Sequence, residues 1–307
     1  MYPIWTFLLL PYTRLEMPGW GKLLSLAKIK VPINDCRWST APTKTIRGKM
    51  HGYWMKLDLS DWSERYTYFL GRYYELEVQQ LLSAILEPGD RFIDVGANIG
   101  MISMHAAHLV TETGKVDCFE PNPECVQAIN DSLARNAISH VNVHPVGLSD
   151  SNGVLQLSLT SSHTGTATLA PVDGVTKSFD VQTLIGDDVV LSDPKRVKLI
   201  KIDVEGFELH VLKGLKRSLE TFPLLITEFE ESHFQRAGTS SSEIMEFLTG
   251  IGYKPYGILS RRKRKWKSYR LQLIPLMSNF KNRKVNDVLW VHAQNPFGSI
   301  IKKYILI

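Results

Sequence analysis

The stretch Phe-Ile-Asp-Val-Gly-Ala-Asn-Ile-Gly at residues 92–100 constrains the fold of this chain more than any other. Its apolar residues predict a strand at 91–95, the glycines that follow predict a tight turn, and a helix is expected over 99–110. A second predicted strand at 115–119 is followed directly by the acid Glu120. Strand, glycine turn, helix and second strand, in this order, build a nucleoside pocket at the edge of a parallel sheet.

The alternation of strands and helices continues through the rest of the chain. Further strands are predicted at 141–146, 197–202 and 224–229, and further helices at 123–136, 206–220 and 241–250. Repeated β-α-β units predict an α/β fold with a doubly wound, mostly parallel sheet and helices on both of its faces.

Two segments depart from this alternation. Residues 153–183 carry an alternating pattern that predicts an inserted β-hairpin, with strands at 154–159 and 167–169. Two last strands are expected at 253–259 and 287–293, on either side of a segment that is basic and aromatic. The sequence thus predicts one sheet with an insertion in its middle and a long connection near its end.

The first 50 residues show no clear hydrophobic period, so we expect an N-terminal extension there and the main domain at 51–307. The apolar run at 1–10 is broken by Pro11 and is too short to cross a bilayer. It is interpreted as a docking segment, with an oligomer contact and a weak interfacial anchor as alternatives.

Composition adds little to the choice of partner. A chain of 307 residues with 44% hydrophobic and 22% charged residues is typical of a soluble globular protein, and a net charge of +5 is a mild bias. Cys36, Cys118 and Cys125 form no C-x-x-C pair, which favours a reducing cytoplasmic setting. Cys118 lies within a predicted strand and is expected in the core.

The spacing of the first motif separates two nucleoside cofactors. Residues 94–100 read D-x-G-x-N-x-G and not the dinucleotide pattern G-x-G-x-x-G. Gly96 and Gly100 let the backbone turn and approach a ligand closely. The carboxylate of Asp94 would repel a pyrophosphate but suits a cationic sulfonium, and Glu120 can accept hydrogen bonds from both ribose hydroxyls. The predicted cofactor is therefore S-adenosylmethionine (SAM).

A second motif, Leu-Ile-Lys-Ile-Asp-Val-Glu-Gly-Phe-Glu, occupies residues 199–208. Its strand ends in Asp203 and Glu205, and a helix is expected to begin at Gly206 with Glu208 in its first turn. These acids either cap the helix, whose N-terminal end favours negative charge, or face the ligand at the sheet edge. For Asp203 and Glu205 we favour the second interpretation.

With these motifs, residues 50–260 resemble the FkbM family of SAM-dependent methyltransferases. The resemblance is carried by D-V-G-A-N-I-G at 94–100, F-E-P-N-P at 119–123, G-L-S-D at 147–150, K-I-D-V-E-G-F-E at 201–208 and T-E-F-E at 227–230. The stretch at 66–75, Tyr-Thr-Tyr-Phe-Leu-Gly-Arg-Tyr-Tyr-Glu, also looks like the family's opening segment.

The resemblance implies a class I methyltransferase fold, with a Rossmann-like seven-stranded sheet whose last strand is antiparallel. It implies methyl transfer to hydroxyl groups, often of polyketides or sugars, and the predicted acceptor is a sugar, a glycan or glycolipid, or a related natural product. Carried onto this sequence, the cofactor-binding residues are Asp94, Gly96, Ala97, Asn98, Gly100, Glu120, Pro121, Asn122, Gly147, Leu148 and Asp203. The glycine loop would line the methionine end of SAM, Glu120 would hold the ribose, and Asn122 and residues 146–148 would lie near the adenine.

Methylation of an alcohol requires a group that removes its proton. The catalytic candidates are Asp203, Glu205, Glu228, Glu230, Lys201 and His163, the last in a polar loop expected to cover the pocket. We favour Asp203 and Glu205. Clustered carboxylates could instead bind a divalent ion that lowers the pKa of the hydroxyl, but no metal motif is present and no metal ligand is assigned.

Seven of the ten residues at 261–270 are basic, and Trp266 and Tyr269 lie among them. Such a run is typical of a solvated loop, but it could also bind a phosphorylated acceptor or an anionic membrane surface. Peripheral attachment at the inner membrane surface is therefore an open alternative. Homo-oligomer formation is a separate open alternative. RNA ribose methylation is one alternative function and SAM binding without catalysis is another. Methylation of base nitrogens is disfavoured, because D-V-E-G at 203–206 replaces the N/D-P-P-Y/F motif of that class.

Overall fold

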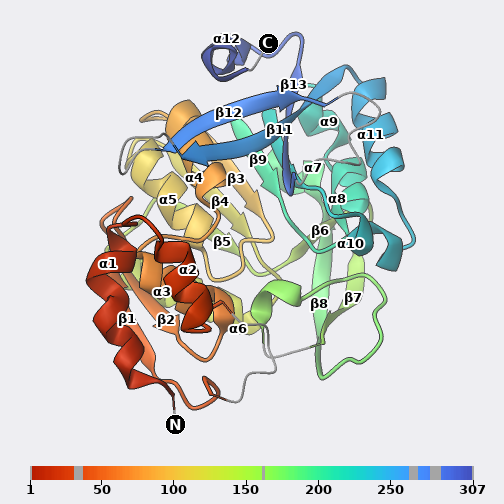
Figure 1. Ribbon diagram of the computed structural model, residues 1–307. Coiled ribbons are helices and arrows are strands. Elements are labelled where there is room, and N and C mark those ends of the chain that lie inside the picture. Colours follow the sequence, from red (N-terminus) through yellow and green to blue (C-terminus); the bar gives the residue numbers. More distant parts are fainter. Residues whose placement is uncertain (1, 31–36, 161–162, 263–268, 277–284, 306–307) are drawn as a thin grey trace.

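The computed structural model describes residues 2–30, 37–160, 163–262, 269–276 and 285–305. One large sheet crosses the molecule with helices on both sides, and the N-terminal helices form a separate layer near one end (Figure 1). In spatial order the eight strands are β12 (Tyr269–Pro275), β11 (Tyr253–Arg262), β13 (Asp287–His292), β10 (Leu224–Glu228), β9 (Leu199–Ile202), β3 (Arg91–Val95), β4 (Lys115–Phe119) and β5 (Val141–His144).

The strand directions confirm the doubly wound sheet. Strands β5, β4, β3, β9 and β10 are parallel neighbours, whereas β13 runs antiparallel to both β10 and β11. The sheet has one strand more than the seven expected, because Tyr269–Pro275 pairs with β11 along its outer edge. Leu271 and Leu273 are buried on this strand, so an alternating apolar pattern directly follows the basic run in which no strand was predicted.

Alternate residues of β3 divide the core in two. Phe92 packs in one cluster with residues of α4 (Leu76–Ile85) and α5 (Met101–Val110). Ile93 and Val95 pack in the other with residues of α8 (Glu208–Gly214) and α11 (Ser241–Gly250). Remaining helices between the strands are α6 (Pro123–Arg135), α7 (Gly186–Val190), α9 (Lys216–Leu219) and α10 (Glu231–Arg236), and α12 (Gly298–Ile301) follows the last strand. Cys118 is free and fully buried in the first cluster, as predicted.

The insertion forms a three-stranded sheet of β6 (Gly147–Ser149), β7 (Gly153–Leu159) and β8 (Lys177–Ile185). Strands β7 and β8 make the predicted antiparallel hairpin, but its second strand lies at 177–185 and not at 167–169. Residues 167–169 touch β7 through one bridge, between Ser158 and Thr168. The hairpin arms therefore leave residues 163–176 as a connection that is available to approach the main sheet.

The N-terminal residues form their own small unit. It comprises η1 (Ile4–Leu9), α1 (Leu10–Arg14), α2 (Trp20–Leu26), β1 (Thr43–Arg47), β2 (Trp54–Asp58) and α3 (Trp62–Leu70) around a separate apolar cluster. The helices and the strand within the first 50 residues are too short to produce a hydrophobic period, whereas the pattern at 50–59 predicts one or two short strands and β2 lies there. The hairpin β1–β2 spans the boundary expected at residue 50. Among the described helices, none is long and apolar enough to span a membrane.

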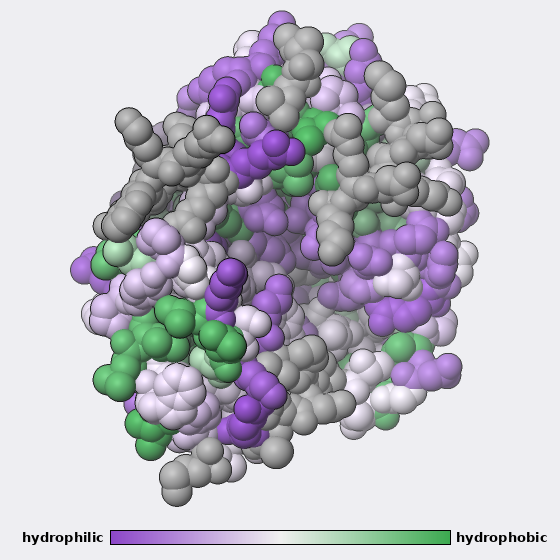
Figure 2. All heavy atoms as spheres, viewed as in Figure 1, coloured by the Kyte–Doolittle hydropathy of each residue, from purple (hydrophilic) through white to green (hydrophobic). Residues whose placement is uncertain are grey.

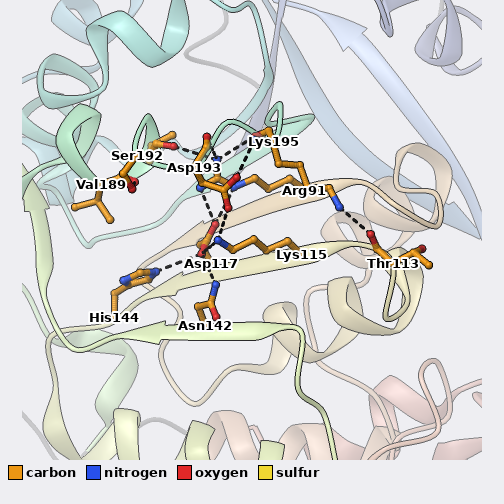
Figure 3. A network of polar contacts seen from close by, with 11 residues as sticks. Arg91, Thr113, Lys115, Asp117, Asn142, His144, Val189, Ser192, Asp193 and Lys195 are labelled. Atoms are coloured by element: carbon orange, nitrogen blue, oxygen red, sulfur yellow. Dashed lines mark hydrogen bonds and ion pairs between the residues drawn. The ribbon is translucent and has the colours of Figure 1, made fainter.

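A buried polar network joins the sheet to the loop that precedes β9 (Figure 3). The Nη2 atom of Arg91 lies 2.9 Å from Oδ2 of Asp117, and its Nη1 donates to the carbonyls of Val190, Asp193 and Lys195. Asn142 on β5 donates to Oδ1 of Asp117. The network thus fixes the register of β3, β4 and β5, the strands that carry the first motif.

We expect Asp117→Asn to lower the free energy of unfolding by about 2 kcal/mol at pH 7, because a charged hydrogen-bond partner of buried Arg91 is removed. Burial alone would raise the pKa of Asp117, but hydrogen bonds from His144 and Asn142 and the charge of Arg91 hold it well below its usual value. The stabilisation is therefore present above the ordinary carboxyl pKa and lost as pH falls through the folded value. Urea unfolding at neutral and acid pH measures it.

Asp173→Asn, at an exposed position, is the matched control and should change stability by less than about 0.5 kcal/mol. An equal loss in both variants, or a loss for Asp117→Asn that does not shrink in acid, would contradict the role of the network.

Candidate active site

A cleft opens at the carboxyl ends of β3, β4, β9 and β10, and its non-atom space is about 1100 Å³ with the open mouth included. Twelve of the residues predicted for the site line this cleft: Asp94, Gly96, Ala97, Asn98, Glu120, Pro121, Gly147, Leu148, Lys201, Asp203, Glu205 and Glu228. Residues that are far apart in the sequence are thus brought to one place, at the sheet edge where doubly wound folds bind ligands.

The two sequence motifs meet at Gly96. This residue has φ +80°, and a Cβ added to it would lie 1.8 Å from the carbonyl oxygen of Asp203. Only glycine satisfies both conditions, since backbone atoms cannot move aside as a flexible side chain can. Gly100, with φ +79°, caps the N-terminus of α5 and does not line the cleft.

Glu120 lies at the carboxyl end of β4 and shapes the floor of the cleft. Its Oε2 accepts a hydrogen bond from the backbone N–H of Asn98 at 2.7 Å, and its Oε1 accepts one from Asn122 at 2.8 Å. Burial raises the pKa of Glu120 to about 7, although these two amides favour its ionised form. The side chain of Asn122 caps α6 by accepting from the N–H of Glu124 and is not part of the cleft wall.

Asp94 offers an open acceptor in the same cleft. Ser103 donates to its Oδ2, while its Oδ1 is buried and has no hydrogen-bond partner among the described residues. Burial raises the pKa of this carboxyl, and the charge of Lys201 opposes the rise. A buried oxygen without a partner is costly, so the site favours a ligand that carries a donor or a positive charge.

Acids outnumber bases around Lys201. Its Nζ donates to Oδ2 of Asp203 at 2.7 Å. Burial by itself would lower the pKa of Lys201, but Asp203, Asp94 and Glu75 hold it above its usual value. Burial and Asp203 together raise the pKa of Glu228 well above the normal carboxyl range. One lysine cannot neutralise this cluster, and the surplus of carboxyl groups suits a cationic cofactor.

Glu75 is a site residue that sequence reasoning missed. It precedes α4 and lines the cleft, and its Oε2 is buried without a hydrogen-bond partner in the part of the chain that the structure describes. Burial, followed by the charge of Asp203, raises its pKa to about 7. In the sequence, Glu75 ends the stretch 66–75, which resembles the family's opening segment, but no pattern there predicts a site residue.

A second group of acids lies beside the cleft. Nδ1 of His233 is 3.1 Å from Oε2 of Glu205 and 3.1 Å from Oε2 of Glu228, and Arg236 lies 3.7 Å from Glu205. Burial and the neighbouring Glu228 raise the pKa of Glu205 to about 9. One ligand atom from each of Glu205, Glu228 and His233 lies within 4.8 Å of the others, so the three could contact a single cation.

His163 lies outside the cleft wall and holds the covering loop in place. Its Nδ1 is 2.6 Å from Oδ2 of Asp61, which caps α3, and its ring packs against Trp62. The next residue, Thr164, lines the cleft and donates to Oδ1 of Asn98 at 2.9 Å. The loop around His163 therefore covers the site as expected, with the histidine itself pointing to α3.

Two other predicted features lie away from the cleft. Glu230 caps α10 by accepting from the N–H of Ser232. Arg261 and Arg262 end β11, Tyr269 and Arg270 begin β12, and residues 263–268 of the basic run lie outside the described residues.

The model of the methyltransferase FkbM domain matches residues 94–255, more than half of the chain. Hexuronic acid methyltransferase AglP of Haloferax volcanii is 29% identical over 176 residues, which are 57% of this chain and 68% of that protein. Methyltransferase sdnD of Sordaria araneosa is 33% identical over an alignment of 160 residues, which covers 42% of this chain and 61% of that protein.

A crystal structure of methyltransferase FkbM from Methylobacillus flagellatus KT is 16% identical with a TM-score of 0.41, and the match covers 75% of this chain and 53% of that one. A SAM-dependent O-methyltransferase from Thermotoga maritima is 13% identical with a TM-score of 0.40, covering 71% and 65% of the two chains. The chain thus spans little more than half to two thirds of most of these proteins.

Proposed function

Because this chain belongs to the FkbM family and is a SAM-dependent methyltransferase, we propose that it methylates a hydroxyl group of a sugar, a glycan or a related natural product. The observation that carries this proposal is Glu75, a carboxyl group in the cleft with a pKa near 7 and a buried oxygen without a partner. A base of this kind is required for an alcohol acceptor and not for a strongly nucleophilic one.

The residues of the first motif fit SAM. Asp94 would accept from the ammonium group at its open Oδ1, Glu120 would accept from the ribose, and Gly147 and Leu148 would line the adenine side. When bound, SAM supplies an activated methyl group. The carboxyl groups around Lys201 outnumber this one lysine and would stabilise the positive charge of SAM. These residues would therefore bind and orient the methyl donor.

The remaining acids would serve the acceptor. Glu75 would accept the hydroxyl proton, and the hydrogen bond from Lys201 would hold Asp203 in a fixed orientation. Glu205 and Glu228 would line the acceptor side with raised pKa values, which lets them donate as well as accept hydrogen bonds to sugar hydroxyls.

The relative AglP, a hexuronic acid methyltransferase by name, supports a sugar as the acceptor class. RNA ribose methylation would use the basic run at 261–270, and SAM binding without catalysis would use the cofactor residues alone. A phosphorylated acceptor would also use the basic run. These remain alternatives to be separated by assay.

The test is turnover by the full chain with SAM and three acceptors: methyl glucoside, methyl glucuronoside and an unstructured RNA. Mass spectrometry should find one added methylene on a sugar hydroxyl and none on the RNA. A parallel reaction with EDTA tests for a cation at Glu205, Glu228 and His233. Methylated RNA with unmodified sugars would overturn the proposal, as would SAM binding without turnover on any hydroxyl compound.

A further inference from the structure

The outer face of the N-terminal helices is apolar. Of the nine large hydrophobic side chains that are exposed among the described residues, five lie here: Ile4 (59% exposed), Trp5 (58%), Leu8 (83%), Leu15 (53%) and Leu26 (80%). We call these five residues the apolar patch. Figure 2 shows hydrophobic residues gathered at the lower left, over the helices that Figure 1 labels α1 and α2.

The helices that carry the patch are held firmly from their other side. Phe7 packs against Tyr68 and Phe69 of α3, and Thr13 donates to the carbonyl of Phe69 at 2.7 Å. Leu24 on α2 is almost completely buried in the N-terminal cluster. The helices have therefore already buried one apolar face, and the patch is a second face that the fold itself does not use.

Within residues 2–30, which carry the patch, the exposed charge is positive. Residues 2–30 contain four basic residues and one acid, Glu16. Glu16 is buried and paired with Arg72 and Lys49, so it contributes no negative charge to the surface. Lys22 and Lys28 are exposed and make no ion pair with any residue that the structure describes. The segment that carries the patch thus has exposed cations and no exposed acid.

We propose that the apolar patch docks on an anionic lipid surface, with Trp5, Leu8 and Leu26 inserted at the boundary of headgroups and acyl chains. A short amphipathic element with aromatic and aliphatic residues on one side and lysines beside them is suited to this boundary. Lys22 and Lys28 would contact the anionic headgroups. A second copy of the chain fits less well, because a two-fold contact would place the same cations opposite one another.

The patch lies on the same unit as one wall of the cleft. Helix α1 packs on α3, and α3 contributes Ser63, Glu64 and Thr67 to the cleft lining. Docking would therefore keep that wall close to the lipid surface. The inference does not depend on the proposed acceptor, since lipid binding is measured without turnover.

The experiment is co-sedimentation of the full chain with vesicles of phosphatidylcholine, alone or mixed with phosphatidylglycerol, at low and high salt. The chain should bind the mixed vesicles, more weakly at high salt, and hardly bind pure phosphatidylcholine. The double variant Leu8→Ser, Leu26→Ser should lower partitioning at least about tenfold. The double variant Lys22→Glu, Lys28→Glu should lower it by at least about tenfold and remove the preference for phosphatidylglycerol.

The matched controls are Val154→Ser and Lys213→Glu, an exposed apolar residue on β7 and an exposed lysine on α8, and they should change partitioning by less than about twofold. SAM affinity, measured in every variant, should be unchanged and reports that the chain is folded. The inference is overturned if the chain ignores both vesicles or if the controls lose as much binding. It is also overturned if Leu8→Ser, Leu26→Ser dissociates a dimer that forms without lipid.

Discussion

Replacing Glu75 with glutamine is expected to lower kcat at least about 100-fold at pH 7, while the affinity for SAM changes little. The substitution keeps the shape of the side chain but removes the group that we propose accepts the proton of the acceptor hydroxyl. Glu75 has a raised pKa of about 7, so it is well matched to take up a proton under neutral conditions. Single-turnover measurements with saturating SAM separate this loss from any change in binding.

The raised pKa of Glu75 also predicts the direction in which the reaction rate changes with pH. In the unmodified enzyme kcat/KM should rise with pH through about 7, as Glu75 of the free enzyme ionises, and level off above it. The variant should lack this rise. Glu77→Gln, two residues along on α4, is the matched control and should retain activity. If Glu75→Gln turns over within threefold of the unmodified enzyme and Glu228→Gln does not, the base is Glu228.

Glu120→Ala is expected to weaken SAM binding at least about 100-fold in a calorimetric titration. The substitution removes the proposed partner of the ribose and also releases the backbone N–H groups of Asn98 and Asn122. Each hydrogen bond from a ribose hydroxyl to the charged carboxylate would contribute about 1.5–3 kcal/mol. The loss of two such bonds to the ribose accounts for the expected weakening of SAM binding. The loop that carries Asn98 would also be less well ordered before SAM binds.

Glu120→Gln should weaken binding less than Glu120→Ala, because one amide oxygen can still accept a hydrogen bond. Glu124→Ala, on the exposed side of α6, should bind SAM normally. Since the pKa of Glu120 is raised to about 7, the affinity for SAM should fall as pH drops below that value. Unchanged affinity in Glu120→Ala would show that the ribose is held elsewhere.

The residues that we propose hold SAM could be predicted to lie together in one cleft, because their signals are local. Asp94 and Gly96 follow one strand, Glu120 follows the next, and the parallel sheet brings the ends of neighbouring strands together. Of the residues predicted for the cofactor, Gly100 and Asn122 have capping roles instead of positions in the cleft wall. Glycine and asparagine are suited both to capping a helix and to lining a cofactor site, so the sequence pattern does not distinguish these two roles.

The acceptor side was less predictable because it depends on packing between distant segments. Glu75 and the cleft-lining residues of α3 lie before the first strand of the sheet, in a segment whose place over the cleft is set by tertiary contacts. His163 was expected in the cleft, but its partner Asp61 is 102 residues away and no spacing rule joins them. Strand β12 was not predicted, because the strong positive charge at 261–270 is typical of a solvated loop and the strand begins within that run.

The contact between Gly96 and the carbonyl of Asp203 has a consequence for how this enzyme could diversify. There is no room for a methyl group between these two residues. The loops at 94–100 and 201–206 therefore form one block, and a larger side chain at their contact cannot be used to widen the cleft. A change of acceptor would have to come from the walls supplied by α3 and by the connection at 163–176, and this connection meets the block through the side chains of Thr164 and Thr168. Engineering for new acceptors should therefore leave 94–100 and 201–206 untouched and redesign those two walls.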